Sequence, residues 1–347
     1  ITGSAGKTTA VAMLAHALSY TGSVGQTQGS ANLPIGIAWN IASMPQEAPY
    51  WVVEMAIGSM TRNTDIVRPD IAIVTNIAAS HLEYHHSLDE IARKKALIFQ
   101  GMPPNGVAIL YRDMPQYAYL AEQARSYHLK VVSFGEHADA DIRILEFAGN
   151  SGRITFDGAS YEVYMGAAGR HMLLNAVAVL AVARHDNLPL DTVMARLASF
   201  QAVAGRGEVR AIDYHGVAIT VYDEAYNANP LSMRMALEAF SALPVDVEHK
   251  LLIIGDMLEL GSESEALHLE LVPILAALSA RRILLCGQHC QALAPLLGGV
   301  AAGVFHFSDV KALEAALSDH LMSQDRVLVK ASHGIGLHTL FSHLTRG

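Results

Sequence analysis

The sequence predicts an α/β protein of two domains, each built around a mostly parallel sheet. For most of the 347 residues, short apolar runs typical of strands alternate with segments of helical periodicity, and this alternation is typical of a sheet with helices on both faces. Hydrophobic residues make up 51% of the chain, so two buried cores can form. A glycine-rich loop leads into the first helix pattern and marks the first domain.

The glycine-rich loop is the first element, and residues 11–18 follow it with an apolar helix pattern. It consists of Gly3, Ser4, Ala5, Gly6, Lys7, Thr8 and Thr9. Its glycines let backbone N–H groups converge on one anion, and the following helix adds the positive end of its dipole. Lys7 supplies a mobile charge and Thr8 a hydroxyl for magnesium. Although the loop is shorter than the usual nucleotide loop, it predicts binding of nucleotide phosphates, with ATP as the nucleotide.

The strands and helices of the first domain follow in alternation. Expected strands cover residues 50–54, 70–76, 107–111 and 130–134. Helical periodicity covers residues 89–99, 117–127, 174–184 and 190–199. Between these helices, residues 141–165 change to short alternating segments, including 153–156 and 161–164. Such segments predict an antiparallel edge or a small antiparallel subsheet.

A second series of strands and helices begins near Val209. Its expected strands cover residues 217–222, 250–254, 282–286 and 326–330. Its helices are expected to begin near Leu231, Glu265, Val310 and Gly336. The glycines on either side of Arg206 predict a hinge between the two series. We therefore expect a P-loop, ATP-binding domain over residues 1–206 and a Rossmann-like α/β domain over residues 207–347.

Composition narrows the possible partners. The formal net charge of −9 argues against a nucleic-acid partner, which would need a basic face. No apolar run is long enough to cross a bilayer. The two cysteines, Cys286 and Cys290, cannot form a disulfide framework, which fits a reducing cytoplasm. We interpret them as buried or loop residues rather than metal ligands. Because Ile1 stands where a strand should be under way, we expect the natural chain to extend upstream, with room for an N-terminal domain.

Polar side chains follow two of the expected strands. Glu54 ends the strand at residues 50–54, and His81 follows the strand at residues 70–76. Ligands gather at the carboxyl ends of parallel strands, where a carboxylate, an imidazole and the Thr8 hydroxyl can hold magnesium beside phosphates. Taken singly, Glu54 is equally well explained as a solvated strand end and His81 as a helix-capping residue.

Two cationic residues are further candidates. Lys95 lies on the helix expected at residues 89–99, whose apolar positions bury one face. A desolvated lysine loses proton affinity, and its neutral amine can add carbon dioxide to give a carbamate. From the sequence alone, a surface lysine beside Lys94 is the stronger interpretation. Arg206 can reach a γ-phosphate when domains close, although flanking glycines are equally common around a plain linker arginine.

The strongest local motif is DEAYNANP at residues 223–230, which follows a strand and precedes a helix. Other motifs are TNI at 75–77, HLE at 81–83, GRH at 169–171 with Asn175, and GDMLELG at 255–261. Together with the phosphate loop, they occur in the order of the Mur ligase family. The chain resembles this family over nearly its whole length, nearest the members that add D-alanyl-D-alanine to a cell-wall precursor.

The resemblance implies an ATP-dependent amide ligase that uses Mg²⁺ and joins a small-molecule amine to a carboxylate through an acyl phosphate. It implies a magnesium site of Thr8, Glu54, His81 and a carbamylated Lys95, and catalytic roles for Lys7, Lys95, His81 and Asn76 near the acceptor. It implies nucleotide contacts from Asn175 to adenine, from Arg206 to the γ-phosphate, and from Glu224, with Asp223 just before it, to the ribose. It also implies that Tyr226 and Asn227 bind the nucleotide.

The chain also departs from the family pattern. The N-terminal nucleotide-sugar-binding domain is not in this sequence, and Met172 replaces a polar residue near the nucleotide. The tail reads KASH at residues 330–333, where these ligases tend to show Lys-Gly-Ser-Arg. Because substrate-facing positions differ most, two alternatives stay open. One is a Mur-type ligase for cyanophycin, polyglutamate or a specialised metabolite, and the other is a non-catalytic nucleotide-binding subunit.

Overall fold

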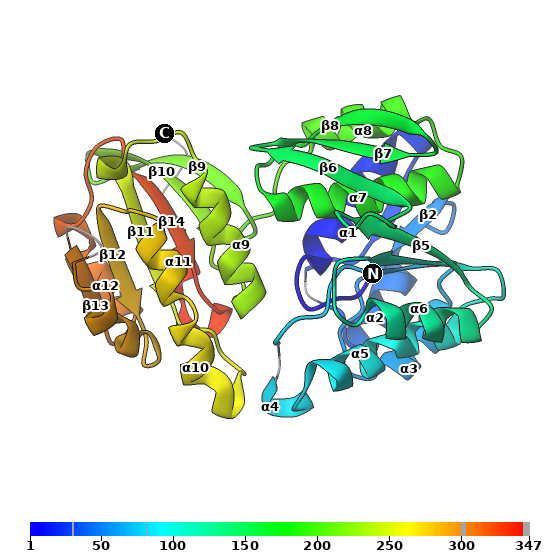
Figure 1. Cartoon of the computed structure of the whole chain (residues 1–347), viewed down its shortest axis with the longest axis horizontal. Helices are drawn as coiled ribbons and strands as arrows, with labels where there is room; N and C mark the ends of the chain where they lie inside the picture. Colours follow the sequence, from blue (N-terminus) through cyan, green and yellow to red (C-terminus); the bar gives the residue numbers. More distant parts are fainter. Residues whose placement is uncertain (30, 81, 300–302, 343–347) are drawn as a thin grey trace. The chain divides into compact units, whose positions relative to one another are not determined.

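The chain folds into two compact units, each with its own sheet and apolar core (Figure 1). The computed structural model describes residues 1–29, 31–80, 82–299 and 303–342. The first unit comprises Ile1–Ala78 and His85–Gln201, and the second comprises Ala79–Tyr84 and Ala202–Gly347. The domain boundary expected after Arg206 stays a prediction, since the compact units divide after Gln201 and the second unit also includes residues 79–84.

The first unit contains a mostly parallel sheet with the strand order β3-β4-β5-β6-β7-β8. These strands are β3 (Ile71–Val74), β4 (Val107–Tyr111), β5 (Lys130–Gly135), β6 (Ile142–Ala148), β7 (Ser151–Phe156) and β8 (Ala159–Tyr164). Pairing is parallel from β3 to β6 and antiparallel from β6 to β8. A separate parallel pair joins β1 (Val24–Gln26) to β2 (Tyr50–Val52). The predicted parallel sheet with an antiparallel part is confirmed.

Helices cover both faces of this sheet. They are α1 (Lys7–Leu18), α2 (Pro34–Ser43), α3 (Met60–Val67), α5 (Leu88–Ala96), α6 (Tyr117–Ser126), α7 (Arg170–His185) and α8 (Leu190–Ser199). Figure 1 shows α7 on one side of β5 and α6 on the other, and both helices contact β4 and β5. Strand β4 is apolar and buried over Val107–Leu110, as expected for a parallel strand covered on both faces.

The second unit contains a sheet with the strand order β13-β12-β11-β14-β10-β9. Its strands are β9 (Glu208–Tyr214), β10 (Val217–Glu224), β11 (Lys250–Gly255), β12 (Arg282–Cys286), β13 (Gly303–Phe307) and β14 (Arg326–Lys330). Its helices are α9 (Pro230–Ser241), α10 (Ser264–Leu269), α11 (Val272–Ala277) and α12 (Val310–Ala316), and α4 (Leu82–His85) begins in its short segment. Pairing is parallel except between β9 and β10, so the expected Rossmann-like α/β arrangement is confirmed.

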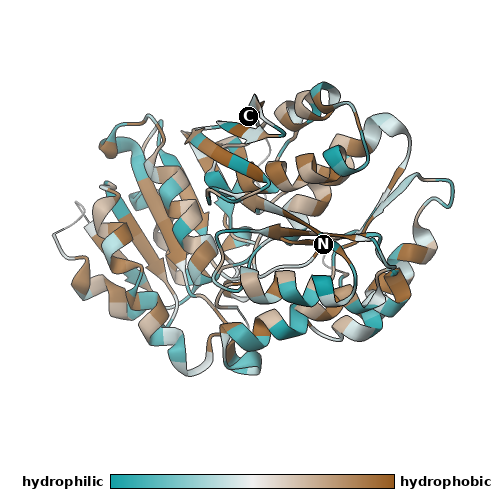
Figure 2. Ribbon diagram, turned by 45° about the vertical axis from the view of Figure 1, so that its right-hand side comes forward, coloured by the Kyte–Doolittle hydropathy of each residue, from teal (hydrophilic) through white to brown (hydrophobic). Residues whose placement is uncertain are grey.

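Two apolar cores cover the two faces of this second sheet. Leu251 and Ile253 of β11 belong to one cluster, which includes Leu313 of α12. The alternate residue Leu252 belongs to the other, which includes Leu237 of α9. Successive side chains of a strand point to opposite faces, and Figure 2 shows the strands of both sheets as largely hydrophobic. Within the described ranges, no helix combines the length and the apolar character needed to cross a membrane.

Three expected elements differ in the structure. The helix expected near Gly336 is wrong: two 3₁₀ turns, His333–Ile335 and Leu337–Thr339, stand there. Gly336 has a φ of 88°, a left-handed conformation that ends a helix. The helix expected over residues 89–99 ends as α5 at Ala96 and continues as a 3₁₀ turn. The strand expected at 50–54 ends at Val52, so Glu54 lies just beyond it.

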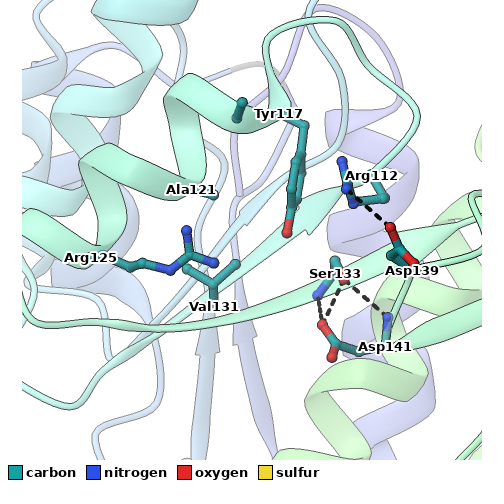
Figure 3. A pocket seen from close by; sticks show the side chains of 9 residues that line it. Arg112, Tyr117, Ala121, Arg125, Val131, Ser133, Asp139 and Asp141 are labelled. Carbon is teal, nitrogen blue, oxygen red and sulfur yellow. Dashed lines mark hydrogen bonds and ion pairs between the residues drawn. The ribbon is translucent and has the colours of Figure 1, made fainter.

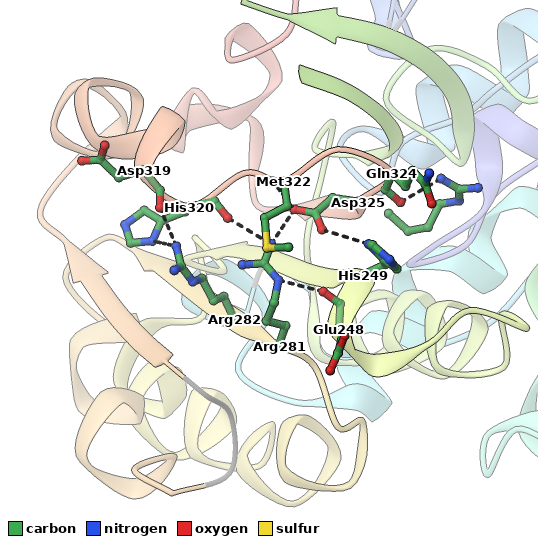
Figure 4. Close-up of polar contacts among 10 residues, drawn as sticks. Glu248, His249, Arg281, Arg282, Asp319, His320, Met322, Gln324 and Asp325 are labelled. Carbon is green, nitrogen blue, oxygen red and sulfur yellow. Dashed lines mark hydrogen bonds and ion pairs between the residues drawn. The ribbon is translucent and has the colours of Figure 1, made fainter. Parts of the chain in front are cut away.

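A polar network joins the amino ends of β11, β12 and β14 (Figure 4). Asp325 is fully buried there, and its Oδ2 accepts a hydrogen bond of 2.5 Å from Arg281. Arg281 also donates to the backbone oxygens of Glu248 and His320. Burial raises the pKa of Asp325, against the opposing effect of Arg281. These contacts hold the ends of three neighbouring strands together.

Candidate functional site

The phosphate loop leaves the carboxyl edge of the first unit's sheet and turns into α1. Thr2 forms a parallel bridge with Val74 at the end of β3, which places the loop at the edge where parallel sheets bind ligands. Gly6 caps α1 with a φ of 80°, which a residue with a Cβ rarely adopts. A Cβ on Gly3 would collide with the Thr75 hydroxyl. Both predicted loop glycines are therefore required by the backbone.

Asn76 and Thr75, which follow β3, brace this loop. The Oδ1 atom of Asn76 accepts a hydrogen bond of 2.9 Å from the Ala5 amide, and its Nδ2 donates to the Ala5 oxygen over 3.1 Å. The Thr75 hydroxyl donates to the same oxygen over 2.6 Å. Ser4 Oγ also donates to the Ala78 oxygen over 3.0 Å. The TNI motif thus holds the loop in shape, and the role of Asn76 near the acceptor stays a prediction.

A carboxylate faces the start of α1. Thr8 donates a hydrogen bond of 2.6 Å from its hydroxyl to Glu54 Oε2. The amide of Asn32 donates to Glu54 Oε1 over 2.7 Å, and Glu54 is only 2% exposed. A carboxylate and a hydroxyl supply the hard oxygen donors that Mg²⁺ prefers beside phosphates, so these residues fit a magnesium ion. The predicted magnesium ligand His81 lies outside the described residues.

Two lysines converge on one backbone oxygen of the loop. Lys7 Nζ donates to the Gly3 oxygen over 3.0 Å, and Lys95 Nζ donates to the same oxygen over 2.9 Å. Lys95 is only 2% exposed, so the surface-lysine interpretation is wrong. Burial lowers the pKa of Lys95 well below its usual value, and the Lys7 charge lowers it further, while Glu54 raises it. A neutral amine is therefore accessible at this position.

Asn175 of α7 lies against the phosphate loop. A Cβ on Gly6 would lie 3.2 Å from Asn175 Oδ1, so glycine leaves room for this side chain. Asn175 is 5% exposed, and its Nδ2 has no hydrogen-bond partner among the described residues. A buried amide donor without a partner is costly, and a bound ligand would relieve that cost. Its predicted contact with adenine stays a prediction.

Sequence reasoning missed two residues that shape the magnesium-type site. Asn32 binds the Glu54 carboxylate, and the Thr27 hydroxyl accepts a hydrogen bond of 2.9 Å from the Glu54 amide. Both follow β1, which has three residues, too few to show strand alternation. Their only signal in the sequence is two polar side chains in the segment before the helix that begins at Pro34.

The second unit holds the other predicted nucleotide residues around one turn. The Arg206 guanidinium lies 4.0 Å from the centroid of the Tyr226 ring. Backbone hydrogen bonds join Tyr226 to Gly205 over 3.1 Å and Gly207 to Asp223 over 2.9 Å. The hinge segment and the DEAYNANP motif are therefore held together, and the structure brings Arg206 to Tyr226.

The acidic residues of this motif already have partners. Asp223 is buried, lies 3.6 Å from Arg210, and accepts a hydrogen bond of 3.1 Å from the Ala225 amide. Burial raises its pKa, while the Ala225 amide and Arg210 oppose that effect. Glu224 Oε2 lies 3.7 Å from Lys330 Nζ. Asn227 is exposed, and its Oδ1 accepts from the Ala228 amide over 2.9 Å. Their roles at a ribose stay predictions.

Asp256 of the GDMLELG segment lies in a buried cluster with His268 and Cys290, which resembles a metal site in residue type. His268 Nε2 accepts a hydrogen bond of 2.9 Å from the Met257 amide, and its Nδ1 lies 2.6 Å from the Ser264 oxygen. Asp256 accepts from the His289 and Cys290 amides. Burial raises the pKa of Cys290 well above its usual value. Because the Met257 amide engages the Nε2 lone pair of His268 and burial favours the protonated form of the Cys290 thiol, the cluster does not fit a metal ion.

An open polar pocket of about 480 Å³ lies over β5 and α6 (Figure 3). The Arg112 guanidinium lies 4.2 Å from the centroid of the Tyr117 ring. Asp141 Oδ2 accepts hydrogen bonds from the amide and hydroxyl of Ser133 over 2.7 and 2.6 Å. None of the predicted site residues lines this pocket, so it is not part of the candidate site.

Comparison with known proteins assigns both parts of the chain to one family. Residues 1–183 match the Mur ligase middle domain, and residues 205–333 match the Mur ligase glutamate ligase domain. The UDP-N-acetylmuramoyl-tripeptide–D-alanyl-D-alanine ligase of Escherichia coli is 31% identical over 97% of this chain and 74% of its own length. The protein of the same name from Bacillus subtilis is 28% identical over 99% of this chain and 75% of its own length.

Solved structures agree with these matches. A crystal structure of MurF from Acinetobacter baumannii is 28% identical, has a TM-score of 0.84, and covers 98% of this chain and 74% of its own. MurF ligase from Thermotoga maritima, in complex with ADP, shares the fold with a TM-score of 0.84 at 24% identity, over 98% of this chain and 77% of its own. With two domain models matched over most of its length and a relative above 30% identity, the chain belongs to the Mur ligase family.

Proposed function

We propose that this chain is an ATP-dependent carboxylate–amine ligase that joins D-alanyl-D-alanine to UDP-N-acetylmuramoyl-tripeptide, as the names of its relatives indicate. The observation that carries the proposal is the phosphate loop, with the Thr8–Glu54 pair at its helix and the buried Lys95 beneath it. The ATP requirement and the reducing environment implied by two free buried cysteines favour action in the cytoplasm.

The loop is suited to hold the phosphates of ATP. Backbone N–H groups at the start of α1 and the Lys7 ammonium can bind phosphate oxygens. Thr8 and Glu54 would hold Mg²⁺, which screens the phosphate charges during transfer. The unpartnered amide of Asn175 can donate to the nucleotide. From the resemblance we assign Arg206 to the γ-phosphate, Glu224 with Asp223 to the ribose, and Tyr226 and Asn227 to the nucleotide.

We further propose that Lys95 carries a carbamate. Its neutral Nζ adds to the carbon of CO₂, a C–N bond forms, and one amine proton passes to solvent. The low pKa that burial gives Lys95 favours the neutral amine. The product is an anion beside the Lys7 ammonium, because both lysines reach the Gly3 oxygen. The carbamate anion would be attracted to the Lys7 ammonium and would provide a carboxylate-like oxygen for the metal site.

The reaction then proceeds in two transfers. A carboxylate oxygen of the acceptor attacks the γ-phosphorus, the bond to ADP breaks, and an acyl phosphate forms. The amine attacks the acyl carbon, and the tetrahedral intermediate expels phosphate while the amine loses a proton. Lys7 and Arg206 are proposed to neutralise charge on the transferring phosphoryl group. The chain's own contribution is positioning and electrostatic stabilisation.

The test is the substrate dependence of phosphate release. Purified protein is mixed with ATP, Mg²⁺, the muramoyl tripeptide and D-alanyl-D-alanine, and phosphate and product mass are measured. We expect phosphate release only with both substrates, together with a product of the mass of the new amide. Lys7→Ala should abolish both signals. Release without the amine would indicate a plain ATPase, and an amide formed only with a different amine would favour a substrate outside the cell wall.

A further inference from the structure

The carboxyl end of β14 carries a buried ammonium that the proposed mechanism does not use. Lys330 is the last residue of this inner strand, with Glu224 of β10 opposite it on one side and Ile254 of β11 on the other. It is only 2% exposed. Its Nζ donates to the backbone oxygen of Asn227 over 2.6 Å and to that of Glu224 over 3.2 Å. The Glu224 carboxylate lies 3.7 Å away.

These contacts direct the ammonium toward the turn. An ammonium has three donors and no acceptor; two hydrogen bonds go to the backbone oxygens of Asn227 and Glu224, and the Glu224 carboxylate lies within ion-pair distance at 3.7 Å. Burial lowers the pKa of Lys330, Glu224 opposes that effect, and the Arg206 charge adds to it. Lys330 is 2% exposed and its hydrogen bonds go to the backbone of the turn. Its contribution is therefore expected to pass through the turn that it binds.

That turn carries predicted nucleotide residues. Residues 225–229 connect β10 to α9 and include Tyr226, whose ring lies under the Arg206 guanidinium. The Tyr226 amide donates to the Gly205 oxygen over 3.1 Å. A short path of contacts therefore runs from Lys330 through the turn to Arg206. Ser332, two residues after Lys330, also donates to the Ala228 oxygen over 3.4 Å, so the same segment holds the turn at two points.

We propose that Lys330 is a positioning residue for the nucleotide: its buried ammonium fixes the turn at residues 225–229, and thereby places Tyr226 and Arg206, without touching the nucleotide itself. This inference rests on the proposed function, because it takes Arg206 as a nucleotide-binding residue. It predicts that most of the contribution of Lys330 to ATP affinity is lost when Arg206 is absent.

Lys250 offers a matched control at the other end of the same sheet. It is the first residue of β11, it is 6% exposed, and its Nζ donates to the Ser241 oxygen over 2.8 Å. Lys250→Met and Lys330→Met therefore both remove a buried ammonium that binds backbone oxygen. We expect both variants to lose thermal stability, but only Lys330→Met to weaken ATP binding, by roughly 10- to 100-fold, because a small misplacement of a binding group is costly.

The measurements are the Kd for ATP, determined directly without turnover, and the melting temperature. In an Arg206→Ala background we expect Lys330→Met to change the Kd less than threefold, since two residues that act through one path are not additive. Three results would overturn the inference. They are an equal loss of ATP affinity from Lys330→Met with and without Arg206, an unchanged Kd for ATP in Lys330→Met, and a loss of ATP affinity in Lys250→Met equal to that in Lys330→Met.

Lys330→Gln keeps two donors in a shorter side chain and serves as the second variant. We expect a Kd between those of the wild type and Lys330→Met. If neither Lys330 variant folds while Lys250→Met does, Lys330 is a residue of the fold and the positioning role is refuted. If the wild type itself binds no ATP, the proposed function fails. If the wild type and Lys330→Met both bind ATP normally, the proposed function is still supported and only the positioning role of Lys330 is refuted.

Discussion

Replacing Lys95 by alanine is the most direct perturbation of the proposed site. The variant removes the side chain that would carry the carbamate, but it leaves Thr8, Glu54 and the loop contacts of Asn76 in place. ATP affinity should therefore change little. The variant loses one of several oxygen ligands of the metal. A single positioned group in a phosphoryl-transfer site stabilises the transition state by about 3–4 kcal/mol, so kcat should fall ~10²–10³-fold.

The assay is phosphate release with both substrates present, with and without added formate or acetate. A small carboxylate can enter the cavity left by Lys95 and supply the missing oxygen, so part of the lost rate should return. Lys94→Ala is the matched control, because Lys94 is the neighbouring residue, partly exposed and paired with Glu90 over 2.8 Å. We expect it to keep the wild-type rate. Full activity in Lys95→Ala, or a folded inactive variant that no acid revives, would refute the carbamate.

Four further outcomes are expected. Glu54→Gln should raise the Mg²⁺ concentration needed for half-maximal activity roughly 10- to 100-fold, measured by metal titration. Burial raises the pKa of Cys286 from 9.0 to about 12, so the folded state favours the protonated thiol and should lose stability as pH rises from about 9 to about 12. Neither Cys286 nor Cys290 should react with a thiol reagent at neutral pH before unfolding; prompt reaction would contradict this burial. Asp325→Asn leaves Arg281 without its charge partner and should cost about 3–5 kcal/mol of unfolding free energy, measured by denaturant titration.

Elements with one dominant physical signal could be predicted from the sequence. Strand β11 is predicted at residues 250–254 because a short run of apolar residues is typical of a buried parallel strand. In the structure it spans Lys250–Gly255. The tail near Gly336 was expected to be helical and is not, because one left-handed residue interrupts a segment whose composition otherwise suits a helix. Strand β1 has three residues, and so short a strand depends on its pairing with β2 rather than on its own pattern.

The residues of the candidate site also fall into two groups, those that the sequence alone indicates and those that only the tertiary structure reveals. The phosphate loop is local, so its glycines, Lys7 and Thr8 are apparent in the sequence. The burial of Lys95 depends on which side of α5 faces the loop, and adjacent lysines give no local reason to choose Lys95 over Lys94. Likewise, the contact of Asn32 with Glu54 joins two segments through the tertiary fold. Sequence pattern therefore identifies groups that act within one turn of chain, and tertiary structure is needed for groups that converge from several.

The charges around Gly3 indicate why this site needs its ligands. Lys7 and Lys95 both donate to one backbone oxygen, and the nearby Glu54 carboxylate is engaged by Thr8 and Asn32. Two ammonium groups that share one neutral acceptor repel each other in a region of low dielectric constant. A phosphate group would attract Lys7 away from the Gly3 oxygen, and carbon dioxide would convert Lys95 into an anion. Each proposed ligand relieves the same repulsion, so once one is in place the other has less to gain from that relief, and we expect carbamylation of Lys95 and ATP binding to be only weakly coupled. Measuring the Kd for ATP at low and high dissolved carbon dioxide, at constant pH, tests this expectation; a change in Kd of roughly tenfold or more would contradict it.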